Sequence, residues 1–310
     1  MVRSSANSTC AIRVPHREPC KNRPCEDDMS SPKQWPGGDF LSEVVITYMS
    51  RRDTDRPWVT TLLDAPQPLL RRFSFSVSSW TRVVSAPTNA GWVAGRSLQA
   101  LALAAISSLD RSVDGKVGYV DRMALEQLSQ DVLHASAAQR DGALIALWIA
   151  SRAWGGGART QRYTQDALNQ PTLLNHLRAS EASVRAGKMP IGTPVTGSGM
   201  SYWSKWLWAL GLSCWSATGP HPLILDSRVR VTLGWVRARE IAATGSRVSG
   251  PVGTPTGMSA YQDYLELLQR VAAGVRSSRV SSALDAEKLE WLLWSATVGE
   301  HHTMLDDLRH

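Results

Sequence analysis

Apolar residues recur at helical spacing along most of this chain. The clearest segment is 137–154, AAQRDGALIALWIASRAW, in which apolar positions line a helix face until the glycines at 155–157 end the pattern. Residues 96–109 form a second segment, rich in Ala and Leu, with high helix propensity. The same spacing predicts further helices at 121–135, 171–186, 200–211, 226–243, 259–275 and 284–297. Because no segment sustains an alternation of apolar and polar residues, we predict an all-α protein with at most a few short strands near its N-terminal third.

The first 38 residues differ in composition from the rest of the chain. They are rich in Ser, Pro, Arg, Asp and Glu, and a segment with so little apolar surface is typical of a disordered tail. We therefore predict a disordered tail at 1–38 and one helical domain at 39–310. Two segments near the start of that domain, 40–51 and 57–72, are short and ambiguous, and helix is the structure we consider for both.

The composition is compatible with several functional classes. The 310-residue chain carries 34 Lys and Arg against 27 Asp and Glu, a net charge of +7 with an isoelectric point of about 9.5. An excess of this size suits contacts with DNA phosphates, although many basic proteins bind no nucleic acid. The chain has 13 Trp but only three Phe. We expect most of these Trp residues in the core. Because a buried indole N–H needs a partner, we expect some of them along a groove or pocket instead.

The four cysteines indicate neither a disulfide framework nor a metal site. Cys10, Cys20 and Cys25 lie in the tail near His16, but no CxxC spacing is present, and Cys214 stands alone in the helical domain. The sequence has no signal-like segment and no apolar run of about 18 residues. We expect a cytoplasmic protein with no metal, no cofactor and no membrane contact. A monomer is the simplest expectation, although the sequence does not decide the oligomeric state.

Two short segments carry the candidate chemistry. Residues 197–205, GSGMSYWSK, place two glycines before a predicted helix that contains Lys205. Residues 222–228, PLILDSR, form an apolar run that ends at Asp226, 21 positions after the lysine. A nucleophile and a carboxylate are therefore predicted at the edges of two elements that can hold them in place.

Lys205 can act as a nucleophile only if its amine loses the proton. The ordinary pKa of lysine is about 10.4, so this use requires a desolvated setting or nearby positive charge. One helix face is apolar and should be buried: Trp203, Trp206, Leu207 and Leu210. Ser201 and Ala209 lie one turn before and after Lys205, and these small neighbours predict open space at the ammonium. A lone lysine of this kind is ordinarily a solvated surface charge, and the glycines and Asp226 are what favour the catalytic interpretation.

The glycines before the lysine predict a phosphate-binding helix terminus. Gly197 and Gly199 permit a tight turn with positive φ and a close approach of another backbone. The free N–H groups of the helix that follows, together with Ser201, can donate hydrogen bonds to a phosphate oxygen without reading base sequence. A Gly-x-Gly pattern alone often marks no more than the start of a helix.

Asp226 is predicted to cap the next helix. An acid after a buried run and before Ser-Arg-Val is a good N-cap, and the capping N–H groups fix the carboxylate. A fixed, ionised carboxylate can stabilise the sugar cation that forms as a glycosidic bond breaks, and it can help to deprotonate a lysine. A purely structural cap is the alternative. Arg228 and Arg230 then lie at the start of this helix, where a phosphate contact is natural.

The order and spacing of these residues resemble the helix-hairpin-helix DNA glycosylases, specifically the 8-oxoguanine DNA glycosylase-like branch and its stand-alone bacterial members. The resemblance covers the short signature and the helical layout around it. It implies two helical subdomains around a helix-hairpin-helix core, with a cleft between them that receives a nucleotide flipped out of double-stranded DNA. It also implies that Lys205 attacks C1′ and forms a Schiff base beside Asp226. The spacing departs from the best-known repair enzymes, in which the lysine follows the hairpin glycines almost directly.

The resemblance further implies that aromatic side chains sandwich the flipped base. The candidates are Trp154, Trp203, Trp291 and Trp294. In this family the last helix often contributes to the base pocket. Glu287 and Glu290 on that helix could read exocyclic amino groups, and a solvated charged face is the alternative.

The sequence leaves the excised base open. Because the hairpin departs from the repair pattern and the loops are long, we favour a phage-modified base removed in antiviral defence, a setting in which bacterial members of this fold also occur. Repair of 8-oxoguanine, with or without AP-lyase activity, is the second hypothesis. A catalytically silent DNA-binding module and a helical interaction protein are the others.

Overall fold

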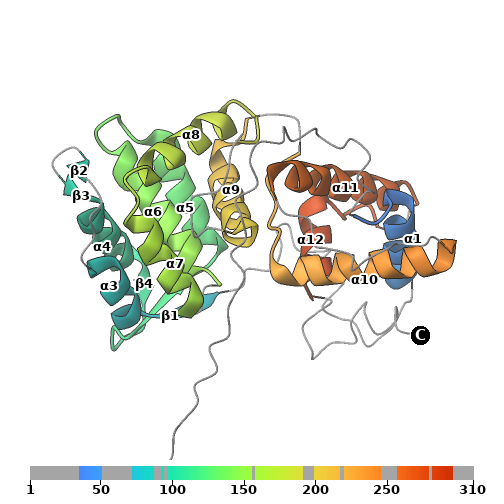
Figure 1. The fold of residues 1–310 in the computed structure, drawn as a ribbon, viewed down its shortest axis with the longest axis horizontal. Helices are drawn as coiled ribbons and strands as arrows, with labels where there is room; N and C mark the ends of the chain where they lie inside the picture. Colours follow the sequence, from blue (N-terminus) through green and yellow to red (C-terminus); the bar gives the residue numbers. More distant parts are fainter. Residues whose placement is uncertain are drawn as a thin grey trace, which may run out of the picture. The chain divides into compact units, whose positions relative to one another are not determined.

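The computed structural model describes residues 35–50, 72–86, 92–93, 96–155, 158–190, 199–216, 220–245, 257–278 and 281–295. Within these ranges the protein is mostly helical, with two small antiparallel sheets (Figure 1). The predicted all-α class is confirmed. Residues 1–34, which include Cys10, Cys20 and Cys25, and nearly all of segment 57–72 lie outside the described residues, so the disordered tail and the domain boundary stay predictions.

The first helical group comes from the middle of the chain. Its helices are α3 (Val77–Ser85), α4 (Leu98–Ser108), α5 (Arg122–His134), α6 (Arg140–Ala153), α7 (Ala158–Leu168), α8 (Leu173–Arg185) and α9 (Met200–Cys214). Helix α6 contacts α4, α5, α7, α8 and α9 (Figure 1). Its residues from Leu144 to Ala153 are nearly all buried, because this stretch is apolar around most of its circumference. Helix α6 therefore forms the centre of this group, and its C-terminal end is held rigidly.

Short strands flank this group. Strand β5 (Val117–Val120) pairs with β1 (Phe73–Ser76) on one side and with β4 (Asp110–Arg111) on the other, both antiparallel. A separate pair joins β2 (Trp92–Val93) to β3 (Arg96–Ser97). Strands β1 to β3 lie in the N-terminal third, as predicted, while β4 and β5 follow shortly after it.

The second helical group joins the start of the described chain to its end. It consists of α1 (Gly38–Ser50), α10 (Ser227–Thr244), α11 (Met258–Ser277) and α12 (Ala286–Ser295). Helix α1 packs against α10 and α11, and α12 packs against the same two helices (Figure 1). Just before α1, the Trp35 indole donates a hydrogen bond to the Ala260 carbonyl at 3.0 Å, and the Gly37 N–H donates to Glu240 at 3.0 Å. These contacts attach residues 35–37 to α10 and α11.

Most predicted helices are confirmed to within a few residues. Asp121 caps α5 as predicted, with its carboxylate accepting the Ala124 N–H at 2.9 Å. Helix α9 runs about one turn beyond its predicted end at residue 211 and stops at Cys214. The apolar pattern misses α3 and α7, because α3 is short and rich in Ser and Val while α7 carries few apolar residues.

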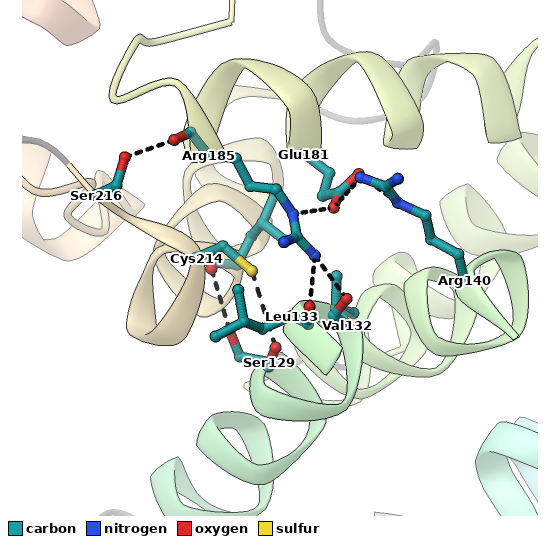
Figure 2. Close-up of polar contacts among 9 residues, drawn as sticks. Ser129, Val132, Leu133, Arg140, Glu181, Arg185, Cys214 and Ser216 are labelled. Carbon is teal, nitrogen blue, oxygen red and sulfur yellow. Dashed lines mark hydrogen bonds and ion pairs between the residues drawn. The ribbon is translucent and has the colours of Figure 1, made fainter. Parts of the chain in front are cut away.

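A buried carboxylate fixes α8 against α5 and α6 (Figure 2). The side chain of Glu181 is 1% exposed and accepts hydrogen bonds from Arg140 at 2.9 Å and from Arg185. Arg185 also donates to the carbonyls of Val132 at 2.8 Å and Leu133 at 3.1 Å, the last turn of α5. Two guanidinium groups and two carbonyls thus offset the cost of desolvating these charges.

The C-terminal end of α9 is anchored next to this cluster (Figure 2). The Ser129 hydroxyl accepts the Ser213 N–H at 3.2 Å, and the Cys214 thiol lies 3.8 Å from the Ser129 carbonyl. Ser216 donates to the Arg185 carbonyl at 2.5 Å. Burial raises the pKa of Cys214, so the thiol stays protonated and acts as a packing group. The helix that carries Lys205 is therefore held firmly at this end.

Candidate active site

A cavity of about 250 Å³ opens between the two helical groups. It is formed by β1, the C-terminal end of α6, the first half of α9, the turn into α10, and α12. Its lining residues are Phe73, Trp154, Gly155, Ser201, Tyr202, Lys205, Ile224, Asp226, Ser227, Arg228, Glu290, Trp291 and Trp294. The fold thus brings Lys205 and Asp226 to one cavity, as predicted, although helices from distant parts of the chain build its walls.

The Lys205 ammonium faces this cavity from the wall of α9. The residue is 8% exposed, and Nζ lies 5.6 Å from the centroid of the Trp154 ring and 6.0 Å from that of Tyr202. Aromatic faces attract a cation but accept no proton from it. The amine is therefore held between two rings with its nitrogen directed at the open space.

Several charges act on this amine. Burial lowers the pKa of Lys205, because the charged form loses its hydration. Asp226 and Glu290 act in the opposite direction, while the guanidinium groups of Arg228 and Arg152 lower the pKa further. The net direction is downward, which increases the fraction of neutral amine near neutral pH.

Arg152 lies on α6, is almost fully buried and does not line the cavity. Its Cζ is 5.0 Å from the centroid of the Tyr202 ring and 5.2 Å from that of Trp148. Burial lowers the pKa of Arg152 to about 10, so the group remains a cation at neutral pH. Thr160 donates a hydrogen bond of 2.8 Å to the Tyr202 hydroxyl and fixes that ring. The sequence analysis identifies none of Arg152, Thr160 and Tyr202 as site residues. The one sequence signal for Arg152 is a charged residue within the apolar end of segment 137–154.

Gly155 closes the site on the side of α6. It has φ +72, the left-handed region, and a Cβ built there would lie 3.1 Å from the Lys205 Nζ. Trp154 precedes it as the C-cap of α6. The glycines at 155–157 predict only a helix stop, and the need for a small residue beside Lys205 does not follow from that pattern.

Asp226 caps α10 as predicted. Its Oδ1 accepts the Arg228 N–H at 2.8 Å and the Val229 N–H at 3.1 Å, and its Oδ2 accepts the Trp294 indole N–H at 3.0 Å. The carboxylate is 9% exposed and lines the cavity. Three donors from α10 and α12 therefore hold it in one orientation.

The extended segment before Asp226 has its backbone bound by side chains. Tyr261 binds both the N–H and the carbonyl of Leu223, at 3.1 and 2.6 Å. The Leu225 N–H donates to Ser204 of α9 at 2.9 Å. A buried backbone that belongs to neither helix nor sheet needs such partners. Ser204 ties this segment to the turn of α9 that carries Lys205, which fixes the distance between amine and carboxylate.

The two acids of the last helix have different roles. Glu290 is 4% exposed, lines the cavity and accepts the Ile224 N–H at 3.1 Å. Glu287 forms an ion pair with Arg122 and accepts the Trp208 indole N–H at 3.0 Å. A solvated charged face, the alternative interpretation of both, is therefore wrong for Glu290. Glu287 does not line the cavity and instead joins α12 to α5 and α9.

Three of the four predicted base-pocket Trp residues line the cavity. Trp154 stacks on Trp208 with ring centroids 5.1 Å apart and an interplanar angle of 19°. Trp291 and Trp294 of α12 form an edge-to-face pair at 5.3 Å and also line the cavity. Trp203 is 4% exposed in the core and is not a lining residue. It lies on the apolar face of α9, the face that buries the helix.

The predicted DNA-contacting residues are only partly at the cavity. Ser201 and Arg228 line it, with the Arg228 Cζ 4.6 Å from the Trp294 ring. Arg230 is half-buried on α10 and does not line it; burial lowers its pKa. Gly197 lies outside the described residues, so the hairpin it was predicted to form stays a prediction. Gly199 precedes α9 with φ −60, so the predicted positive φ is wrong at this glycine.

The space beside Lys205 comes from a different source than predicted. Ala209, one turn further along α9, is fully buried in the core and does not line the cavity. Ser201 and Gly155 supply the small surface instead. The stripe expected on α9 therefore continues into packed core after a single turn.

The described residues also bear on metals and membranes. No group of three or more His, Cys, Asp or Glu side chains among them could hold a metal ion. No helix in the same ranges is long and apolar enough to cross a membrane.

Comparison with known proteins gives one match. A family model described as "Putative 8-oxoguanine DNA glycosylase OGG-like protein" matches residues 67–294, most of the chain. The matched range contains every residue that lines the cavity, from Phe73 to Trp294, and excludes helix α1. No curated protein and no solved structure matches the chain.

Proposed function

This chain belongs to the OGG-like 8-oxoguanine DNA glycosylase family, and on that premise we propose that it excises a modified base from double-stranded DNA. The observation that carries the proposal is a buried lysine of lowered pKa and a capped aspartate that line the same aromatic cavity. Lys205 is the proposed nucleophile and Asp226 the electrostatic partner.

The proposed reaction begins with neutral Lys205. Its nitrogen attacks C1′ of the flipped nucleotide, the C1′–N bond to the base breaks, and the electron pair of that bond leaves with the base. Burial and the guanidinium groups of Arg228 and Arg152 favour the neutral amine. The attached nitrogen, an ammonium after the attack, then loses one proton. Its lone pair forms the C=N bond to C1′ as the C1′–O4′ bond breaks, and O4′ keeps that bond's electron pair and takes a proton from water. The product is a Schiff base, from which AP-lyase chemistry can proceed.

Asp226 is suited to stabilising the positive charge that develops on the sugar. Its three hydrogen bonds fix the carboxylate before the substrate arrives, so little reorganisation is needed during the reaction. The carboxylate is only 9% exposed, and the lower dielectric of such a setting strengthens this interaction.

The cavity is also suited to a flipped base. A cavity of roughly 150 Å³ admits benzene, so about 250 Å³ can hold a larger aromatic ring system. Trp154 from the end of α6 and Trp291 and Trp294 from α12 offer stacking surfaces. Stacking on such rings contributes about 1–3 kcal/mol per base.

Two classes of modified base are candidates for excision. The compact cavity favours an oxidised purine, in line with the family description, over a base that carries a sugar. A phage-modified base, which we favour on the sequence alone, requires its added group to project through the mouth of the cavity. One assay of base release distinguishes repair from antiviral defence.

Base release from a panel of DNAs tests the proposal. Duplexes carrying normal, oxidised or phage-modified bases are incubated with the protein, and borohydride is added to reduce any Schiff base to a stable protein–DNA adduct. We expect release of one modified base and trapping that depends on Lys205. DNA binding without release or trapping would instead support a silent binding module, and absence of DNA binding would support an interaction protein.

Arg228→Ala is expected to weaken binding to all DNA sequences alike. Arg228 is exposed and lines the cavity, so its charge is available for the proposed phosphate contact. Loss of one such contact lowers the slope of log Kd against log salt by about one unit. Fluorescence anisotropy at several salt concentrations measures this slope. Lys188→Ala, an exposed lysine after α8, serves as the charge-matched control, and an equal slope change for both variants would contradict the assignment.

Gly155→Ala is expected to impair the lysine through crowding. The new Cβ would lie 3.1 Å from the Lys205 Nζ and displace it from the attacking position. Small misplacements of reacting groups can lower rates by about 10²-fold. We expect at least about 10-fold slower borohydride trapping.

Gly115→Ala is the matched control for this variant. Gly115 has φ +69, so alanine meets the same backbone strain, but nothing lies within 4 Å of its Cβ position. Both variants should lose similar thermal stability, and only Gly155→Ala should slow trapping. Equal effects on trapping would attribute the loss to backbone strain.

A further inference from the structure

A third ionisable side chain faces the cavity besides Lys205 and Asp226. Glu290 projects from α12 and is fully enclosed except toward the cavity. It lies one turn before Trp294, the residue that binds Asp226, so the acid and the aromatic wall share one face of α12. The excision chemistry described above assigns it no part.

The two carboxyl groups of the cavity are held differently. Asp226 accepts three N–H donors, whereas Glu290 accepts one, from Ile224 at 3.1 Å through Oε2. Each accepted N–H compensates part of a carboxylate's negative charge. Glu290 is therefore the less compensated of the two carboxyl groups, and carboxyl pairs held in such different environments are typical of acid and base pairs in enzymes.

The net effect of burial and of the groups around Glu290 is to favour its protonated form. Burial raises the pKa of Glu290 well above its ordinary value, and the carboxylates of Glu287 on its own helix and of Asp226 add to this rise. The Ile224 N–H and the Lys205 ammonium lower it. Tyr261 and Tyr264 of α11 are themselves buried and uncharged, since burial raises the pKa of each far above 10.

We propose that Glu290 is the general acid of the excision step, donating its proton to the departing base, an inference that rests on the proposed glycosylase function. As the Lys205 nitrogen bonds to C1′ and the C1′–N bond breaks, the base gains the electron pair of that bond. The Glu290 proton passes to a ring nitrogen or carbonyl oxygen of the base, which leaves neutral. Glu290 becomes a carboxylate and is reprotonated by the proton that the attacking nitrogen loses afterwards.

This role restricts the class of substrate. A neutral carboxyl group donates a hydrogen bond, so the base must present an acceptor atom toward α12. The sequence interpretation, in which a carboxylate on α12 reads an exocyclic amino group, predicts the opposite preference. A base that already carries a positive charge, such as N7-methylguanine, leaves without needing this proton.

Glu290→Gln separates this role from a structural one. The amide carbonyl of glutamine can still accept the Ile224 N–H, and its NH₂ can still donate to the base, but glutamine cannot transfer a proton. General acids contribute about 10²–10⁴-fold to rates. We expect at least about 100-fold slower single-turnover release of a neutral modified base, with unchanged DNA affinity and melting temperature.

The pH profile gives a second readout. Protonated Glu290 is the active form, so base release by the unaltered protein should fall as pH rises through the raised pKa of this group. Glu290→Gln should lose that alkaline limb. Glu266→Gln, an exposed acid on α11 away from the cavity, is the matched control and should keep both rate and profile. A purely structural Glu290 would leave the glutamine variant within about threefold of the normal rate, and that result would overturn the proposal.

A measurement without DNA keeps the two proposals distinguishable. Infrared spectra at pH 7 are compared by subtracting the spectrum of each variant from that of the unaltered protein. The unaltered protein and Glu266→Gln should both show a protonated carboxyl band, and Glu290→Gln should lack it. Absence of this band overturns the acid role. If the band is present but no DNA in the panel loses a base, the glycosylase function is wrong and the acid role falls with it. If base is released equally by both Glu290 forms, only the acid role is wrong.

Discussion

Lys205→Gln is expected to reduce base release by more than about 100-fold while leaving DNA binding largely intact. The glutamine amide can occupy the space between the Trp154 and Tyr202 rings, but its nitrogen is not nucleophilic. A loss of this size corresponds to roughly 2.7 kcal/mol of transition-state stabilisation. Single-turnover assays with the released base quantified by chromatography measure it, and borohydride trapping should disappear in parallel.

Substitution of a second lysine controls for the general effect of removing one positive charge. Lys188→Gln removes the same charge from an exposed position after α8, and we expect its rate to be unchanged. The melting temperature of Lys205→Gln should not fall, because a buried ammonium costs desolvation energy that glutamine avoids. Release at more than about a hundredth of the normal rate would remove Lys205 from the role of nucleophile.

The pH dependence of the unaltered protein bears on the same residue. Neutral Lys205 is the active form, and its pKa is lowered, chiefly by burial. Activity should therefore rise with pH through that lowered pKa, at lower pH than for an ordinary lysine, whose pKa is about 10.4. Arg152→Met, which removes one of the cations near Lys205, should move this limb to higher pH.

The helices, and the positions of Lys205 and Asp226 on them, could be predicted from the sequence because their signals are local. Apolar spacing identifies α6 and α9, and an acid after a buried run identifies Asp226 as a cap. Such patterns depend on neighbours within one or two turns. The placement of Lys205 on a helix that begins at Met200 follows from the same rule.

The walls of the site could not be predicted because they depend on contacts between distant segments. Glu290 is buried only because α12 closes over the segment before Asp226, and its N–H partner Ile224 is 66 positions away. Trp154 and Trp203 look alike in sequence, yet one caps α6 at the cavity and the other lies in the core. No local pattern distinguishes an aromatic that faces a cavity from one that faces a helix.

Asp226→Asn is expected to slow base release by roughly 10²–10³-fold, the loss typical of one preorganised electrostatic group. The asparagine carbonyl can still accept the Arg228 and Val229 N–H groups, so α10 keeps its cap. Its NH₂ group would then face the Trp294 indole N–H, and both the negative charge and that hydrogen bond would be lost. Single-turnover rates and thermal melting measure the two consequences separately.

Asp121→Asn is the control that decides the interpretation. Asp121 is also the N-cap of a helix, α5, and accepts the Ala124 N–H at 2.9 Å, but it does not line the cavity. The same chemical change there tests capping alone, so any fall in melting temperature shared by both variants reflects the caps. A catalytic Asp226 predicts that only Asp226→Asn loses activity far beyond its loss of stability. If both variants lose activity and stability in proportion, Asp226 is a structural cap and the sugar cation must be stabilised by another group.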